Sequence, residues 1–151
     1  MAEAWEKITD KKKWKLTLIG NGPDKEELLR QNDIEIIDFL QQERLCYQLQ
    51  NAGCFVLPSL EEPWAVVLHE VASAGLPILA SDICGAVPYF VLNNYNGITF
   101  RPGSAEQIKI ALEKIINATE SDLLAMAHNS RKLSFRITPE IVARTLLSVL
   151  H

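Results

Sequence analysis

Residues 54–82 read CFVLPSLEEPWAVVLHEVASAGLPILASD, and this stretch decides the fold. Residues 54–57 form a wholly apolar run that ends at Pro58, as expected for a strand buried on both faces. Residues 65–74 have a helical composition and stop at Gly75, a residue that often caps a helix C-terminus. Residues 77–80 form a second apolar run. A strand, a helix and a strand with short connections predict a parallel βαβ unit.

The same alternation continues on both sides of this unit. We predict further strands over 15–19, 34–39 and 97–100, and further helices over 2–8, 24–30, 42–51, 104–115 and 138–150. Ser104 and Gln107 have the spacing of a capping box. The chain is therefore expected to be α/β, with a Rossmann-like parallel sheet that has helices on both faces. Ligands of such sheets bind at the carboxyl ends of the strands.

Residues 1–151 are expected to form a single domain. The first predicted element is a helix with no strand before it, so we expect that the first strand of the sheet lies upstream of this sequence and is missing from it.

Composition excludes several classes of protein. The net charge is −4, and lysine and arginine are scattered apart from the run at 11–13, so nucleic acid is not an expected partner. Cys46, Cys54 and Cys84 form no CxxC pair and are expected to be reduced thiols of a cytoplasmic protein. No apolar run approaches the roughly 18 residues of a membrane span, and the N-terminus lacks a signal-peptide core. No acidic cluster of metal-binding type occurs, so no metal is expected.

Glu62 and Glu70 are the most informative polar residues, with seven residues between them. Glu62 falls in the turn after the 54–57 strand, and Glu70 falls about two turns into the following helix. The free amides and positive end of a helix suit a diphosphate, and a carboxylate can accept hydrogen bonds from adjacent sugar hydroxyls. The alternative is that Glu62 is an ordinary acid at a helix start and Glu70 a solvated surface residue.

The context of these glutamates resembles a known family. Residues 62–70 (EPWAVVLHE), 74–77 (AGLP) and Ser81-Asp82 are similar to the signature of the glycosyltransferase group 1 family, retaining enzymes built from two facing Rossmann-like domains. Residues 18–23 (LIGNGP), 55–59 (FVLPS), Gly85, Pro88 and Asn96-Gly97 match further segments of that family in the same order. The resemblance runs from about residue 15 to 107 and implies the C-terminal, nucleotide-sugar-binding domain.

The resemblance also implies roles for particular residues. Glu62 would be the catalytic residue that faces the donor sugar, and Glu70 would bind the ribose. Other donor-binding positions would be Trp64, Ala65 and Val66, whose backbone would approach the sugar and diphosphate. Gly20 and Gly22 would line the nucleotide cleft, and Phe39 and Leu40 would lie beside the base. Phe39 could instead belong to the core. His69 is more simply a packing residue, since consecutive helical residues point apart by about 100°.

Three residues depart from the family pattern. Ala65 stands where glycine is usual and adds a methyl group near the sugar; Asp38 replaces a common glycine; and Tyr89 stands where an acid is frequent. The acceptor domain and the phosphate-binding loop of the family are not found in the sequence. The chain by itself is therefore expected to be catalytically inactive or nearly so.

The predicted function is therefore retaining transfer of a glycosyl group from a UDP-, GDP- or ADP-linked sugar to an acceptor glycan or lipid-linked glycan. The partners are the nucleotide sugar and a missing N-terminal acceptor domain, with no cofactor. The parent enzyme is expected to be cytoplasmic, with a peripheral position at the inner membrane surface as a possibility. Two alternatives stay open: a non-enzymatic nucleotide-binding α/β module, and a sugar-nucleotide epimerase or phosphorylase of the same architecture.

Overall fold

The computed structural model describes residues 1–29 and 33–149. The strands are β1 (Leu16–Ile19), β2 (Ile34–Ile37), β3 (Phe55–Leu57), β4 (Ile78–Ser81) and β5 (Gly97–Phe100). The helices are α1 (Ala2–Glu6), α2 (Lys25–Leu28), α3 (Gln42–Gln50), α4 (Val66–Ala74), α5 (Val87–Phe90), α6 (Ala105–Asn117), α7 (Glu120–Ser134) and α8 (Pro139–Val149). All five predicted strands are present, and the predicted α/β class is confirmed.

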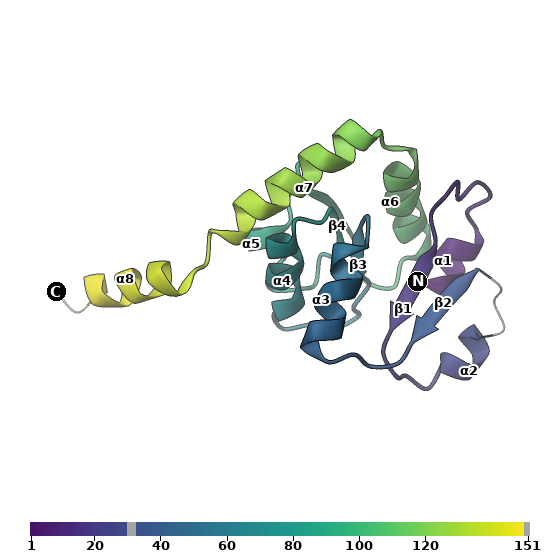
Figure 1. Cartoon of the computed structure of the whole chain (residues 1–151), viewed down its shortest axis with the longest axis horizontal. Helices are drawn as coiled ribbons and strands as arrows, with labels where there is room; N and C mark the ends of the chain where they lie inside the picture. Colours follow the sequence, from purple (N-terminus) through teal and green to yellow (C-terminus); the bar gives the residue numbers. More distant parts are fainter. Residues whose placement is uncertain (30–32, 150–151) are drawn as a thin grey trace.

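The strands form two parallel sheets rather than the single sheet expected from the sequence (Figure 1). β1 pairs with β2, and β3, β4 and β5 pair in that order, all in parallel. Within the described residues, β1 and β3 are edge strands of their sheets, and no ladder of backbone hydrogen bonds joins them to each other. The two strands nevertheless begin close together. The ring of Trp14, just before β1, lies 2.7 Å from where a Cβ on Gly53, just before β3, would stand.

Helices cover both faces of the three-stranded sheet. Ile78 and Ala80 of β4 belong to a core cluster with residues of α4 and α5, whereas Leu79 belongs to a second cluster with α1 and α6. This split follows from the alternation of side chains along a strand, and β4 is buried on both faces as predicted. The second cluster also contains Leu16 of β1, so the two sheets share one core.

A buried polar network, which the sequence analysis did not predict, holds α7 against the sheet. The side chain of Asn96 donates to the Phe90 carbonyl at 2.8 Å and to the Ser130 hydroxyl at 3.0 Å, and it accepts from the Leu92 amide at 2.8 Å. The Ser130 hydroxyl in turn donates to the Leu76 carbonyl at 2.5 Å. Asn96-Gly97 therefore has a structural role at the entry to β5.

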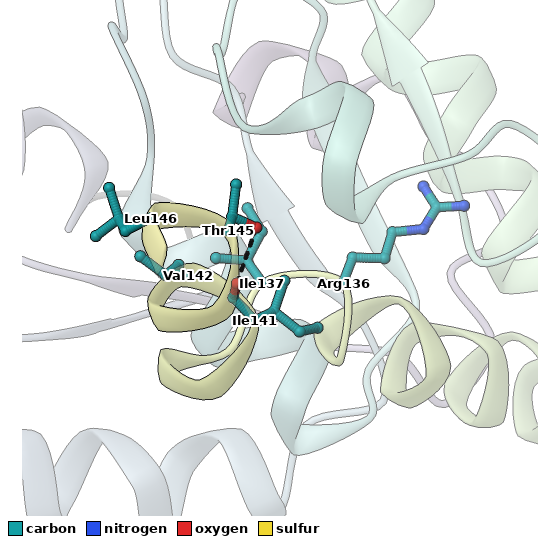
Figure 2. Close-up of a pocket in the computed structure, with 6 residues that line it drawn as sticks. All are labelled: Arg136, Ile137, Ile141, Val142, Thr145 and Leu146. Carbon is teal, nitrogen blue, oxygen red and sulfur yellow. Dashed lines mark hydrogen bonds between the residues drawn. The ribbon is translucent and has the colours of Figure 1, made fainter. Parts of the chain in front are cut away.

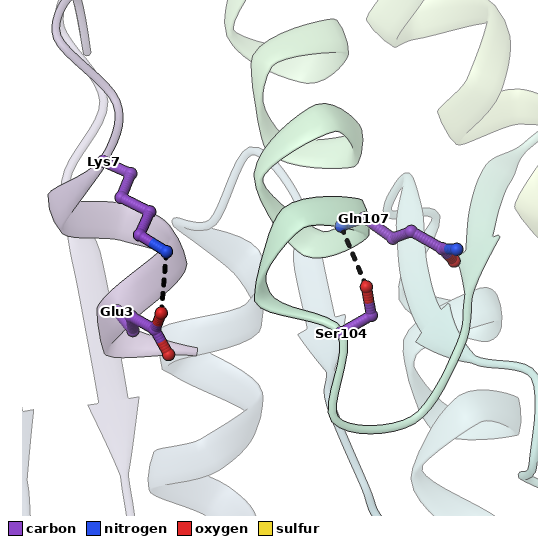
Figure 3. A network of polar contacts seen from close by, with 4 residues as sticks. All are labelled: Glu3, Lys7, Ser104 and Gln107. Atoms are coloured by element: carbon purple, nitrogen blue, oxygen red, sulfur yellow. Dashed lines mark hydrogen bonds and ion pairs between the residues drawn. The ribbon is translucent and has the colours of Figure 1, made fainter.

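The helix starts differ in part from the prediction. Ser104 accepts from the Gln107 amide at 3.3 Å, as expected for a capping residue (Figure 3). However, the Gln107 side chain accepts from the Arg101 amide at 2.9 Å instead of the Ser104 amide, so the predicted capping box is only half formed. A complete capping box occurs at α7, between Thr119 and Asp122.

The C-terminal helix α8 extends away from the rest of the molecule (Figure 1). Its exposed side chains include the apolar residues Ile141, Val142, Leu146 and Leu147. Within the residues that the structure describes, none of the helices combines the length and the apolar character needed to cross a membrane.

Candidate functional site

The turn between β3 and α4 is held by Glu62. One oxygen of its carboxylate, Oε1, accepts hydrogen bonds from the backbone amides of Ala65 at 2.9 Å and Trp64 at 3.3 Å. Glu62 is half-buried. The side chain thus fixes the loop with one oxygen, while its second oxygen makes no hydrogen bond within the described residues.

The N-terminus of α4 has no side-chain cap. Its N-cap residue is Ala65, which has no polar side chain and makes no capping bond. The Leu68 amide bonds back to the Ala65 carbonyl at 3.1 Å, so the amides of Val66 and Val67 are the first free donors of the helix. Val66 is 63% exposed, so solvent reaches this end. Uncapped amides at the positive end of a helix form a natural site for an anion.

Ala65 has a left-handed backbone, with φ 75° and ψ 73°. Such a conformation favours glycine, the residue that the resemblance described above implies at this position. The Ala65 methyl group is buried in the core cluster beside α4 and α5. The methyl group therefore packs inward, and the expectation that it stands close to the donor sugar stays a prediction.

The loop after β4 is hydrogen-bonded to the loop after β3. After β4, the amide of Ala86 donates to the Trp64 carbonyl at 2.8 Å, and the amide of Gly85 donates to the Glu62 carbonyl at 3.4 Å. A Cβ on Gly85 would lie 2.2 Å from the Pro63 carbonyl oxygen, so only glycine fits. The two loops therefore form one rigid rim at the carboxyl ends of β3 and β4.

Glu70 and His69 lie on α4 with different surroundings. The Glu70 side chain is exposed. The His69 Nε2 atom lies 3.0 Å from the Ser134 carbonyl oxygen, and its ring stacks on Phe90 with 4.7 Å between centroids. His69 thus packs between α5 and α7, which agrees with its interpretation as a packing residue.

The residues predicted to line the nucleotide cleft and to flank the base lie at the carboxyl ends of β1 and β2. Gly20 has φ 140°, a conformation that side chains disfavour, and open space surrounds both Gly20 and Gly22. Phe39 is 67% exposed, so it does not belong to the core, and Leu40 is half-buried. Asp38 forms an ion pair with Lys25 near these residues.

Cys84 is a residue of this rim that the sequence analysis did not assign to the site. Burial raises the pKa of its thiol, and the carboxylates of Glu62 and Asp82 raise that pKa further. The bond from the Gly85 amide to the Glu62 carbonyl places Cys84 beside the loop of the candidate catalytic residue. In the sequence, only the position of Cys84 in the turn after a buried strand could have indicated that it lies near Glu62. Burial also raises the pKa of Cys54, to about 12, which fits an unreactive thiol.

Two hollows lie away from this rim. A shallow groove of about 200 Å³ runs along α8 and is lined by Arg136, Ile137, Ile141, Val142, Thr145 and Leu146 (Figure 2). A hollow of about 540 Å³ lies between α6, α7 and the start of β5. Neither contains a predicted site residue. Across residues 1–29 and 33–149, no group of three or more His, Cys, Asp and Glu side chains is placed to hold a metal ion.

Comparisons with known proteins agree with this geometry. The family model described as glycosyl transferases group 1 matches residues 1–133. The lipopolysaccharide glucosyltransferase WaaG of Escherichia coli strain K12 is 36% identical over 81 residues, which are 53% of this chain and 21% of that protein. The chain spans 39% and 21% of the lengths of the first two curated relatives that it matches.

Two solved structures have the same fold. The C-terminal domain of the group 1 family protein LpcC from Francisella tularensis superposes with a TM-score of 0.73 at 22% identity, over 89% of this chain and 75% of that one. HepE of Anabaena, solved in complex with UDP-glucose, superposes with a TM-score of 0.71 at 18% identity, over 89% of this chain and 41% of that one.

Proposed function

The chain belongs to the glycosyl transferases group 1 family, and from this premise we propose that it is the donor-binding domain of a retaining glycosyltransferase. The donor is a nucleoside-diphosphate sugar, and the acceptor is a glycan or a lipid-linked glycan. One observation carries the proposal: the uncapped N-terminus of α4 lies beside the Glu62 carboxylate, at the carboxyl end of β3.

In this proposal the α4 amides of Val66 and Val67 bind the diphosphate. The negative charge on the diphosphate grows when the bond between the anomeric carbon and the phosphate oxygen breaks, and fixed amides stabilise that charge without reorganisation. No metal takes part in the proposed reaction. The free oxygen of Glu62 accepts a hydrogen bond from a hydroxyl of the donor sugar and orients its ring.

The nucleotide extends from α4 toward β1 and β2. The Glu70 carboxylate accepts hydrogen bonds from the two ribose hydroxyls, Gly20 and Gly22 leave room for the nucleotide, and the exposed ring of Phe39 with Leu40 flanks the base. HepE, a protein of similar fold, was solved with UDP-glucose. Because HepE was solved with a uridine nucleotide, uridine-linked donors should be tested first.

We further propose that residues 1–151 form one domain that works beside an N-terminal acceptor domain, with the reaction in the cleft between them. A segment ahead of α1 would supply another strand of this domain, and the exposed apolar face of α8 would pack on the acceptor domain. The proposed location of the enzyme is the cytoplasm, with a peripheral position at the inner membrane surface.

Calorimetric titration tests the donor site. The 151-residue chain and the full-length protein are titrated with UDP-, GDP- and ADP-linked sugars, with and without EDTA. We expect one nucleotide class to bind with EDTA present, and Glu70→Ala to weaken it about tenfold, or about 1.4 kcal/mol. Glu106→Ala, an exposed acid on α6, is the control and should leave the affinity unchanged. Absence of binding by every nucleotide to the full-length protein would refute the proposal.

A further inference from the structure

Two aromatic rings stand exposed on the rim that carries Glu62. Trp64 is 41% exposed and Tyr89 is 45% exposed. Their ring centroids are 5.3 Å apart, with the planes tilted by 51°. Trp64 comes from the loop after β3, and Tyr89 comes from α5, after β4. Neither the proposed diphosphate site nor the proposed nucleotide contacts use these rings.

The backbone under both rings is fixed. The Trp64 amide donates to Glu62, and the Trp64 carbonyl accepts from Ala86. The Tyr89 amide donates to the Ala86 carbonyl at 3.1 Å, and Nη1 of Arg136 donates to the Tyr89 carbonyl at 3.4 Å. The backbone of Ala86 is therefore hydrogen-bonded to both Trp64 and Tyr89. A ligand that binds to the pair meets a preorganised surface and orders little protein on binding.

The position of the pair indicates which part of the reaction it serves. The predicted nucleotide residues lie at β1 and β2, and the diphosphate amides lie at α4, which follows β3. Tyr89 follows β4, which pairs with β3. The pair therefore lies beside the Glu62 loop, next to the proposed site of the donor sugar, where the second substrate of a transfer must meet that sugar.

We propose that Trp64 and Tyr89 form an aromatic platform for the pyranose ring of a saccharide acceptor. A pyranose has an apolar face of C–H groups and a rim of hydroxyls. Aromatic rings suit the apolar face, and the carboxylate of Glu62, which is bonded to the Trp64 amide, suits the hydroxyls. This inference rests on the proposed glycosyl transfer and adds the chemical class of the acceptor subsite. An acyl chain would gain nothing from this carboxylate, so a saccharide fits the rim better than a lipid tail.

Saturation-transfer NMR on the 151-residue chain tests the platform. The probes are the methyl α- and β-glycosides of glucose, galactose and mannose at millimolar concentration, with the aromatic protons of the protein irradiated. We expect at least one glycoside to receive saturation, strongest at the C–H protons of one ring face. Trp64→Ala and Tyr89→Ala should each reduce it at least fivefold. Tyr89→Phe, which keeps the ring, and Tyr47→Ala, which removes an exposed ring on α3, should preserve it.

Three results would overturn the platform. The first is no saturation of any glycoside with the wild-type chain. The second is saturation in both alanine variants equal to that in the wild-type chain. The third is binding of the wild-type chain to phosphatidylcholine or phosphatidylglycerol vesicles, lost in the alanine variants, without binding to glycosides. UDP is included in every sample. If the wild-type chain binds UDP but no glycoside, the platform alone is refuted, whereas failure of every nucleotide with the full-length protein refutes the donor site. Amide spectra of each variant check that it is folded.

Discussion

At Ala65 the chain turns into α4 through a left-handed residue with φ 75°, while the methyl group packs in the core. Ala65→Gly should relieve about 1–2 kcal/mol of strain. The same change loses about 0.8 kcal/mol of methyl burial and costs about 0.5–1 kcal/mol of backbone entropy. We therefore expect a free energy of unfolding within about 1 kcal/mol of the wild type.

Ala65→Val is the informative partner variant. A β-branched side chain at positive φ is a genuine outlier, so this change should destabilise the chain by more than about 2 kcal/mol. Urea unfolding followed by circular dichroism measures both variants. Equal stability of the glycine and valine variants would mean that the left-handed turn at Ala65 does not exist in solution.

Individual residues also show what the sequence could and could not predict. Spacing alone placed Glu62 in the turn and Glu70 on the helix. It could not show that Glu62 bonds to the amides of Trp64 and Ala65, because this depends on the left-handed turn at Ala65. It also could not bring Cys84 beside Glu62, since the two loops meet only after β3 and β4 pair.

Among the elements, the sequence predicted the strands well and missed the helices α5 and α7. The strands are apolar runs bounded by Gly, Pro or polar residues, which is a strong local signal. The buried face of α7 carries Ser130 and Ser134 beside Leu133, so its apolar periodicity is weak. Those serines are buried because they make hydrogen bonds, as the bond from Ser130 to the Leu76 carbonyl shows, and no periodicity reveals such contacts.

The start of α7 has a testable pH dependence. The Thr119 hydroxyl and amide donate to the Asp122 carboxylate and hold the pKa of Asp122 below its ordinary value of 3.8. A lowered pKa means that the folded state favours the charged form. The stabilisation is therefore present above pH 3.8 and is lost as the pH falls through the lower pKa of the folded state.

Asp122→Asn isolates this effect from the titration of other carboxylates. The difference in unfolding free energy between the wild type and this variant should be largest at about pH 6 and shrink toward zero near about pH 2. Chemical denaturation over this range measures it. Asp24→Asn is the control, since the Asp24 side chain does not cap α2. A difference that stays constant with pH would contradict the role of the Asp122 charge.

At the scale of the whole molecule, the division into two sheets is the main difference from the prediction. β1 and β3 share the core cluster that contains Leu16, Leu79 and Val56, yet they exchange no ladder hydrogen bonds. The sequence pattern predicted each strand but not which strands pair, because pairing depends on contacts between distant segments. One further parallel strand between β1 and β3 would give the sheet order common in dinucleotide-binding folds.

Hydrogen exchange tests whether a strand belongs in that position. The Gly20 amide bonds to β2 and the Phe55 amide bonds to the residue before β4. Because amide directions alternate along a strand, the amides of Thr17, Ile19 and Val56 point toward the space between the sheets. In the 151-residue chain these three should exchange faster than those of Leu18 and Leu57, which face their partner strands. Extending the chain by the proposed upstream segment should slow them at least tenfold and raise the midpoint of thermal unfolding. If the extension stabilised the fold while these three amides exchanged as before, the added segment would pack elsewhere and the two sheets would be separate in the full-length protein.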